Sequence, residues 1–574
     1  MKTKGLLRCL ALGMTVFLSD PAHATSGSFS TFTYNIAGLP EVLSSATSAR
    51  QDATERISCY VKQFDFVNVQ EDFNYHAALY DTCDDHPYRS PTSGGAGIGS
   101  GLNSMSRFPY MDWERVSWNN CNGVDCLTPK GFTIARTRLA EGVYVDIYNL
   151  HTQAQIEDAD LVARREDILQ ILGYIETHSA GNAVIVMGDT NTRYTRSGDN
   201  MWEFLRRGFT DVWVSKVRHG DVPAEGTAAL VCSPAYTSPN CEVVDKVLFR
   251  DNGFVGLQAL SFLIPTDTQN AAGEELSDHR GIKTTWSYST ASNRQLSDVW
   301  GGPHGIAFND VYSLPDNPAV STLTIRSGNR VDRVEVTLSN GYIFSHGGTG
   351  GTESSLPLAS NEYLTSLYLC SGSYNNTTRI FYTRFTTSAG RSLAGGKATS
   401  NCTTYTAPSG WQIVGFHGRA GDEVDKLGVV YAPQVSKPAA AIYHQFVNRN
   451  SGRCLGISNG TMANGTQVQQ WACDGGDWQK WSYDARSGLI RSKKDPRYCL
   501  DNGGSFSNGA RIQLWTCNGN ANQRFTVDTA AGTVRMRTHP EQALEVYNLG
   551  TADGANVDTW TFWGGPGQLW NLTP

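Results

Sequence analysis

Residues 440–574 carry a threefold repeat with a fixed period. Trp471, Trp515 and Trp560 lie 44 and 45 residues apart. A period of this length indicates a repeat architecture, in which each unit buries its hydrophobic face only against its neighbours. A β-propeller has a similar period, but three copies are few for a propeller. A triplet of the form QxW or QxF follows each tryptophan at the same spacing: Gln479-Lys480-Trp481, Gln523-Arg524-Phe525 and Gln568-Leu569-Trp570.

Three copies that end in QxW or QxF resemble the ricin B-type lectins, whose fold is a β-trefoil. The resemblance spans residues 442–574 and implies sugar binding by a carboxylate or amide together with an aromatic ring. The first repeat has Gly456 where the family has an aspartate, and the QxW triplets are expected in the core. The expected sugar-binding residues are Asp501, Trp515, Asn522 and Gln523 in the second repeat, and Glu545 and Trp560 in the third.

Residues 289–434 are rich in Gly, Ser, Thr and Val and contain alternating runs such as RVEVTL at 333–338. Alternation between Gly-rich turns predicts antiparallel strands. The segment GFHGRAGDEVDKLG at 415–428, with the Gly-rich segment 346–352, resembles the jacalin-related lectins. That resemblance implies an all-β β-prism.

The sugar-binding loop of the jacalin-related lectins would contain Asp422, Glu423 and Asp425 here. Residues 435–441 would form a linker to the trefoil. Two lectin domains in tandem prolong residence on a surface through effective concentration. We therefore expect glycans on a cell surface or wall as partners.

The first 24 residues have the features of a secretory signal peptide. Basic residues precede the apolar run 10–18, and Ala22-His23-Ala24 is an A-x-A cleavage site. The run is too short to span a bilayer. We expect a secreted, extracellular protein that begins near Thr25, is a monomer and has no permanent membrane anchor.

Cys9 leaves with the signal peptide, so twelve of the 13 cysteines remain. An even number of cysteines in an exported chain indicates disulfides. The cysteines do not form the CxxC pairs that would indicate a zinc site. The sequence leaves the connectivity open. One arrangement joins nearest neighbours: Cys59/Cys83, Cys121/Cys126, Cys232/Cys241, Cys370/Cys402, Cys454/Cys473 and Cys499/Cys517.

The charge balance limits the possible substrates. The chain has 47 lysines and arginines against 54 aspartates and glutamates, a net charge of −7. This balance counts against a nucleic-acid binder held by a basic surface, because such binding depends on neutralised phosphates. It does not exclude an enzyme that meets phosphate through a bound metal.

Residues 25–288 are long enough for one large domain, and their pattern predicts an α/β fold. The runs 143–150 and 183–187 are strand-like, and residues 160–177 have the apolar spacing of a helix. Polar residues stand at the ends of apolar runs in six short islands. These residues are Asn35, Glu71, His151, Asp189 with Asn191, Asp245, and Asp278 with His279.

The chemistry of this set is that of phosphoester hydrolysis. Glu71 and Asp189 are hard oxygen ligands, suited to Mg²⁺ or Ca²⁺ rather than zinc. The two histidines can move protons or stabilise an oxyanion, and Asp245 or Asp278 can orient one of them. A hard cation neutralises charge on the phosphate, and a base activates water.

The six islands resemble the endonuclease/exonuclease/phosphatase superfamily, which folds as a four-layer αββα sandwich. The resemblance implies a divalent metal, Mg²⁺ with Ca²⁺ or Mn²⁺ as alternatives. Residue by residue, it implies the following roles. Glu71 is the principal metal ligand, helped by Asn35 and Asp278; His151 binds the phosphoryl oxygen; Asp189 and Asn191 align phosphate and nucleophile; His279 is the general base; and Asp245 aids proton transfer.

Two segments indicate a branch of this superfamily. DCLTPKGF at 125–132 and LHTQAQ at 150–155 resemble segments of secreted neutral sphingomyelinases, although Thr152 replaces the usual leucine. Lys130 would then meet the phosphate of a phospholipid head group. Trp113 and Trp118 are candidates for an aromatic membrane-inserting hairpin, with a place in the core as the alternative. A deoxyribonuclease I-like nuclease and a lectin with an inert catalytic-like domain are the other two hypotheses.

Overall fold

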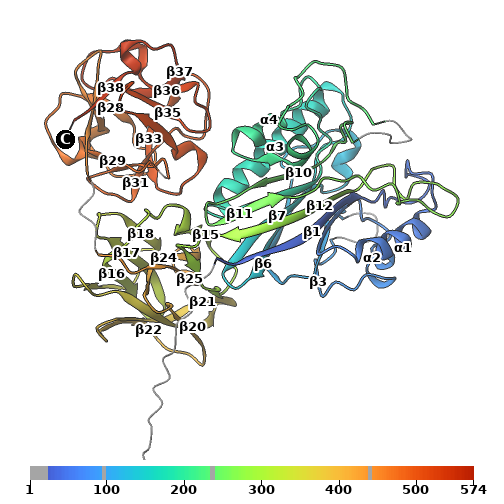
Figure 1. Ribbon diagram of the computed structural model, residues 1–574, viewed down its shortest axis with the longest axis horizontal. Helices are drawn as coiled ribbons and strands as arrows, with labels where there is room; N and C mark the ends of the chain where they lie inside the picture. The colour runs from blue at the N-terminus through green and yellow to red at the C-terminus, as the bar shows by residue number, and fades with distance from the viewer. Residues whose placement is uncertain (1–23, 94–98, 233–238, 437–441, 486, 574) are drawn as a thin grey trace, which may run out of the picture.

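The computed structural model describes residues 24–93, 99–232, 239–436, 442–485 and 487–573. Three units follow one another along the chain: a sandwich of two sheets with helices, a β-prism and a β-trefoil (Figure 1). The expected signal peptide, with Cys9, and most of the expected linker lie outside the described residues. Within the described residues, no helix is long and apolar enough to cross a membrane.

The N-terminal unit contains two six-stranded sheets packed face to face. Its last strand runs to Thr290, past the expected boundary at residue 288. In spatial order the first sheet is β11 (Val255–Ala259), β12 (Ile282–Thr290), β1 (Ser26–Asn35), β2 (Phe66–Gln70), β4 (Asn103–Ser106) and β3 (Tyr88–Arg89). The second is β5 (Tyr110–Ser117), β6 (Gly131–Ala140), β7 (Val143–His151), β8 (Ala183–Asp189), β10 (Asp245–Arg250) and β9 (Thr210–Asp211).

Helices cover both outer faces, so the four-layer αββα sandwich is confirmed. Helices α1 (Arg50–Val61) and α2 (His76–Asp81) lie beside the first sheet, and apolar residues of α1 share a core cluster with β1 and β2. Helices α3 (Asp158–His178), α4 (Trp202–Arg206) and α5 (Val212–Lys216) lie beside the second. Ile168, Leu172 and Ile175 of α3 are buried at helical spacing.

The strand directions bring four polar residues to one edge of the sandwich. β1 and β2 are parallel, and so are β7 and β8. Asn35, His151 and Asp189 are the last residues of their strands, and Glu71 follows β2 directly. The carboxyl ends of parallel strands meet at the same edge, which is where α/β sheets bind ligands.

The second unit confirms the expected β-prism, with three sheets around one apolar core (Figure 1). The first sheet contains β13 (Gln295–Leu296), β14 (Trp300–Gly301), β25 (Val424–Pro433), β24 (Trp411–Ala420) and β15 (Ile306–Asn309). The second contains β18 (Ile343–Gly347), β17 (Val331–Leu338), β16 (Val320–Ser327) and β19 (Thr352–Pro357). The third contains β22 (Ser392–Gly396), β21 (Thr377–Thr387), β20 (Leu364–Tyr374) and β23 (Asn401–Thr406).

The third unit confirms the expected β-trefoil. One sheet is β28 (Val468–Trp471), β27 (Cys454–Ile457), β26 (Gln445–Asn448) and β38 (Trp570–Thr573). The next is β29 (Trp481–Tyr483), β30 (Ile490–Ser492), β31 (Tyr498–Asp501) and β33 (Gln513–Thr516). The last is β32 (Ala510–Arg511), β37 (Val557–Thr561), β36 (Gln542–Val546), β35 (Thr533–Met536) and β34 (Phe525–Asp528).

The QxW triplets make the same contacts in each trefoil repeat. Gln479, Gln523 and Gln568 are fully buried, and each donates from Nε2 to a backbone carbonyl seven residues earlier, at 2.8, 3.0 and 3.0 Å. Trp481 and Trp570 donate to equivalent carbonyls at 3.0 and 3.1 Å. These triplets therefore hold the core, as the sequence predicts.

Six disulfides join the twelve described cysteines, and each joins nearest neighbours in the sequence. Two lie in the trefoil, one in the prism and three in the sandwich. The arrangement that the sequence had left as one of several is thus the one observed.

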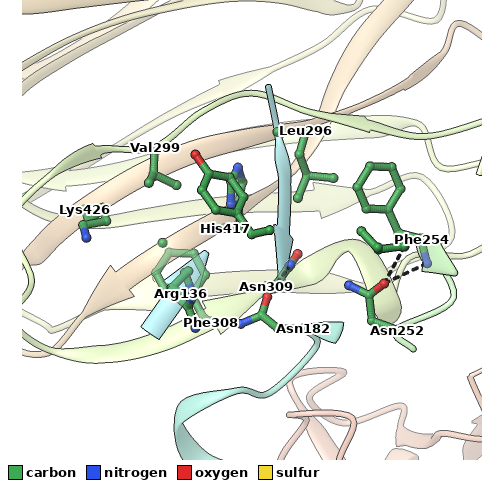
Figure 2. Close-up of a pocket in the computed structure, with 14 residues that line it drawn as sticks. Arg136, Asn182, Asn252, Phe254, Leu296, Val299, Phe308, Asn309, His417 and Lys426 are labelled. Carbon is green, nitrogen blue, oxygen red and sulfur yellow. Dashed lines mark hydrogen bonds between the residues drawn. The ribbon is translucent and has the colours of Figure 1, made fainter. Parts of the chain in front are cut away.

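The sandwich and the prism share a closely packed junction (Figure 2). Asn309 of the prism donates to Asn182 of the sandwich at 2.9 Å, and the cavity between the domains has a volume of only about 10 Å³. Arg138 pairs with Asp298 at 2.8 Å across the same junction. A dense interface of this kind orients the two domains relative to each other.

Candidate active site

A cluster of four polar side chains forms at the shared edge of the two sheets. Asn35 Nδ2 donates to Glu71 Oε1 at 2.9 Å and to Asp189 Oδ2 at 3.1 Å. His151 Nε2 lies 3.4 Å from Asp189 Oδ2 and 3.9 Å from Glu71 Oε1. Asn35 is therefore the bridge that holds two carboxylates from different sheets together.

His279 enters this cluster from the loop that precedes strand β12 and is oriented by Asp245. The distance from His279 Nδ1 to Asp245 Oδ2 is 3.0 Å, and His279 Nε2 lies 3.6 Å from Asp189 Oδ2. Asp245 pairs with Asp189 across the antiparallel strands β8 and β10, which fixes its position. With Nδ1 engaged, Nε2 faces the cluster and is available for proton transfer.

The carboxylates and histidines have strongly shifted pKa values. Burial raises the pKa of Glu71, and burial also raises that of Asp189. Burial disfavours charge on His279, but Asp245 and Asp189 outweigh it and raise the pKa of His279 well above its usual value. Burial, aided by Lys130 and His279, lowers the pKa of His151 well below its usual value. Burial thus favours the neutral form of His151, whereas the neighbouring carboxylates favour the charged form of His279.

A divalent cation fits this donor set. Glu71 and Asp189 offer hard oxygen atoms, which Mg²⁺, Ca²⁺ and Mn²⁺ prefer. Asn35 turns its Nδ2 toward these carboxylates, while its Oδ1 accepts from the Ala37 backbone at 3.0 Å. The Glu71 side chain is 21% exposed, so its carboxylate is open to an entering ion. One donor atom from each of Asp189, Asp245 and His279 also lies within 4.8 Å of the others. A positive charge here would offset the burial of the carboxylates.

Lys130 lies next to the cluster in a tightly fixed segment. Its Nζ pairs with Asp125 Oδ1 at 2.9 Å, and Asp125 Oδ2 accepts from the Ala154 backbone at 2.6 Å. Segments 125–132 and 150–155, which resemble segments of neutral sphingomyelinases, are therefore joined by a hydrogen bond. Gly131 is required here, because a Cβ would lie 1.9 Å from the Val116 carbonyl oxygen.

Two of the residues expected at the active site, Asp278 and Asn191, do not place their side chains in the central cluster. The Asp278 side chain is exposed and accepts a hydrogen bond from Ser45, while Asp245 takes the place beside His279. Asn191 has a positive φ of 49°, and its backbone donates to Asp189 Oδ1 at 2.9 Å. Asn191 thus orients Asp189.

Trp113 and Trp118 pack against the apolar core, as the alternative in the sequence analysis proposed. Trp118 Nε1 also donates to the His151 carbonyl at 2.7 Å. Both rings therefore support the sandwich from within.

A cavity of about 510 Å³ opens beside His279, Asp245 and Asp278. Arg193 and Arg280 also line it, and the sequence analysis did not single them out. Arg193 lies two residues after Asn191, and Arg280 directly follows His279. That adjacency is the signal that would have identified them.

Two trefoil repeats hold their expected sugar-binding residues together. In the second, Asp501 Oδ2 accepts from Asn522 at 2.7 Å and from Gln523 at 3.0 Å, beside Trp515, which is 39% exposed. In the third, Glu545 accepts from Gln568 at 2.7 Å, and Trp560 is 38% exposed.

The first trefoil repeat lacks the space for such a set. A Cβ on Gly456 would lie 2.6 Å from the Trp478 ring. Trp478 therefore occupies the place of the missing carboxylate, in line with the expectation from Gly456.

The expected prism loop is engaged by two arginines that sequence reasoning missed. Arg330 Nε lies 2.9 and 2.8 Å from the two Glu423 oxygens, and Arg379 Nε lies 3.1 Å from Glu423. Arg379 also pairs with Asp425, which is only 1% exposed. Asp422 is exposed, and its backbone touches Gly348 of the Gly-rich segment. No local pattern marks Arg330 or Arg379, because both lie far away in sequence.

Family models match all three units. Residues 40–242 match the family described as endonuclease/exonuclease/phosphatase family 2. Residues 297–430 match the jacalin-like lectin domain, and residues 443–570 match the ricin-type beta-trefoil lectin domain. Three successive segments of the chain thus match an endonuclease/exonuclease/phosphatase family and two families of lectin domains.

Individual proteins are similar to separate parts of this chain. A sphingomyelinase of Mycobacterium bovis is 38% identical over 275 residues, which cover 46% of this chain and 54% of that protein. The chain thus matches about half the length of this relative. Horcolin of Hordeum vulgare subsp. vulgare is 29% identical over 140 residues, covering 23% of this chain and 94% of that protein. The solved sphingomyelinase C from Streptomyces griseocarneus is 17% identical, covers 45% of this chain and 99% of that chain, and has a TM-score of 0.32.

Proposed function

We propose that this protein is a secreted phosphodiesterase that depends on a divalent metal, hydrolyses sphingomyelin or a related phospholipid, and is held near its substrate by glycan binding. The observation that carries this proposal is the His279–Asp245 pair, which faces the Asn35, Glu71 and Asp189 cluster at the edge of the sandwich. The similarity to a mycobacterial sphingomyelinase supports the lipid substrate.

The proposed mechanism assigns one task to each side chain. Glu71, with Asn35 beside it, would hold Mg²⁺, Ca²⁺ or Mn²⁺, and the ion would neutralise phosphate charge. It would also offset part of the carboxylate charge that favours the protonated form of His279, so that the neutral imidazole can act as a base. His279 Nε2 takes a proton from the attacking water, and Asp245 stabilises the imidazolium that results. Asp189, oriented by Asn191, aligns the reacting groups.

Two further groups stabilise the charge that develops on the phosphate. His151, kept neutral by burial, donates to a phosphoryl oxygen in the N–H form of its Nε2. Lys130, held by Asp125, supplies a fixed positive charge close to His151. Asp278 lies at the rim of the cavity, where it contributes electrostatically rather than as a buried ligand.

The lectin domains contribute residence at a glycan-bearing surface. The second and third trefoil repeats each present a carboxylate beside a partly exposed tryptophan. Binding at two sites raises the effective concentration of the catalytic domain at the membrane.

The deciding experiment uses the oxidised protein that begins at Thr25. Wild type and His279→Ala are incubated with sphingomyelin vesicles and Mg²⁺, Ca²⁺ or Mn²⁺ in turn, with EDTA as the control, and phosphocholine is measured. Cation-dependent release by the wild type alone is expected. Folded protein that releases none with any cation would overturn the lipid substrate. Plasmid nicking that depends on His279 would then indicate a nuclease, and glycan binding without any esterase activity would indicate an inert domain.

A further inference from the structure

A second cavity lies where the three domains meet. Its volume is about 320 Å³, much larger than the ~30 Å³ share of one water molecule in the liquid. Arg207 and Arg250 line it from the sandwich, Tyr312 from the prism, and Arg524 and Thr538 from the trefoil. The cavity therefore exists only in the assembled chain.

Two of these arginines are held in fixed orientations. The Arg524 Cζ lies 3.9 Å from the centre of the Tyr312 ring, and its Nε donates to the Gly519 carbonyl at 2.7 Å. The Arg250 Cζ lies 4.7 Å from the centre of the Phe209 ring, and its Nη1 donates to the Arg207 carbonyl at 3.2 Å. Within the residues that the structure describes, each of these two guanidinium groups makes one side-chain hydrogen bond, which leaves further N–H donors for a ligand in the cavity.

The carboxylates around the cavity offset only part of the charge of this pair: Glu176 favours the charged form of both arginines, and Asp251 favours that of Arg524. Glu176 pairs with Arg207 at 3.1 Å, and Glu203 pairs with Arg207 as well. Asp251 is exposed at the cavity rim and forms no ion pair with either arginine in the described part of the chain. Arg537 adds a further positive charge near Arg524.

The two arginines also disfavour each other's charge. Burial, aided by the nearby Arg524, lowers the pKa of Arg250 to about 10, and burial lowers the pKa of Arg524. Two half-buried cations in one cavity cost free energy unless an anion lies between them. Guanidinium groups bind tetrahedral oxyanions well, because their N–H groups match the spacing of the oxygens.

The cavity adjoins the sugar-binding residues of the second trefoil repeat. Gly519 accepts from Arg524, and its own N–H donates to Gln523 Oε1 at 3.2 Å. Gln523 in turn donates to Asp501. One short loop therefore connects the arginine pair to the expected sugar site.

We propose that this cavity binds a tetrahedral oxyanion, sulfate or phosphate, between Arg250 and Arg524. The anion is either a free inorganic ion or a substituent on a glycan that the trefoil holds. Binding joins the sandwich to the trefoil and so stabilises the arrangement of the three domains.

Isothermal titration calorimetry with sodium sulfate tests this site on the full mature protein, with EDTA present and sodium chloride at matched ionic strength as the blank. Wild type is expected to bind sulfate, and Arg250→Gln and Arg524→Gln are each expected to weaken binding at least tenfold. Arg384→Gln is the matched control, because Arg384 also stacks on a tyrosine but lies on the prism away from the cavity. Thermal unfolding in chloride checks that each variant is folded.

A second pair of titrations identifies the source of the anion. Galactose 6-sulfate that binds more tightly than inorganic sulfate, with neutral galactose as reference, indicates a sulfated glycan; equal or weaker binding indicates the free ion. His151→Ala reports on sulfate at the active site. The proposal is overturned if wild type binds no sulfate, or if both arginine variants bind as wild type does while His151→Ala does not.

Discussion

The catalytic edge of the sandwich and the loop of the prism both gather acidic residues, but they treat the charge in opposite ways. At the catalytic edge, Glu71 and Asp189 share an asparagine, and burial raises their pKa values. In the prism, Arg330 and Arg379 already pair with Glu423 and Asp425. The catalytic edge has room for a bound cation, whereas in the prism two arginine side chains already provide the positive charge.

This difference shows that a cluster of carboxylates acquires its chemistry from its neighbours. Carboxylates held by an asparagine and histidines leave room for a metal ion and raise the pKa of a histidine, whereas carboxylates paired with arginines hold a loop in place. The following predictions test each side of the contrast.

Removal of the oriented histidine should have the largest effect. His279→Ala is expected to lower phosphocholine release by about 1,000-fold, because it deletes the proposed general base. His304→Ala, at an exposed histidine of the prism, should retain wild-type activity. Initial rates on sphingomyelin vesicles provide the measurement, and a His279→Ala rate within tenfold of wild type would contradict the assignment.

Neutralising the catalytic carboxylate should weaken cation binding. Glu71→Gln keeps the shape of the side chain but removes its charge, so the Mg²⁺ concentration for half-maximal activity is expected to rise by roughly 100-fold. Glu55→Gln on helix α1 is the control in the same domain. An unchanged Mg²⁺ requirement in Glu71→Gln would mean that the cation binds elsewhere.

In the prism, where arginines pair with the acidic residues, removal of an arginine should change stability rather than catalysis. Arg379→Gln leaves Asp425 buried without its partner, which is expected to cost about 3 kcal/mol of unfolding free energy. The double variant Arg379→Gln/Asp425→Asn should recover much of the loss, and Arg384→Gln on the same strand should change little. Calorimetric unfolding of the full chain measures each. No loss in the single variant would remove the contrast with the catalytic edge.

The smallest effect is expected from a carboxylate pair in the trefoil. Burial, aided by Glu545, raises the pKa of Asp558 to about 7, so the folded state holds this proton more tightly than the unfolded state does. Unfolding free energy should therefore fall as pH rises from about 4 to about 7. Asp558→Asn should flatten this dependence of the trefoil transition, measured by calorimetry at pH 5 and pH 8. A gain in stability that is equal at both pH values would argue against the shift.

Much of the architecture could be predicted from local patterns. The 44- and 45-residue spacing of the tryptophans predicts the trefoil, and alternation at 333–338 predicts strand β17. The helical spacing at 160–177 corresponds to α3, and the strand-like runs correspond to β7 and β8. Periodicity is a property of neighbouring residues, so it survives in the sequence alone.

Partner choice was harder to predict. The sequence left Asp245 and Asp278 as alternatives beside a histidine, and the structure places Asp245 there, 34 residues from His279. Arg330 lies 93 residues from Glu423, and Arg379 lies 46 residues from Asp425. No spacing rule connects such pairs, because strand order in the folded sheets brings them together.

By itself, the sequence determined three successive units, their fold classes and the residue types of a phosphoester site. Tertiary structure alone decided which carboxylates meet an asparagine and histidines at the catalytic edge and which ones meet arginines in the prism. It also decided that Arg250 and Arg524 line one cavity. The physical reason is the separation along the chain over which each kind of interaction acts. Repeats and hydrophobic periods are encoded along the chain, whereas the energy of a charge depends on burial and on groups that only folding brings within a few ångströms.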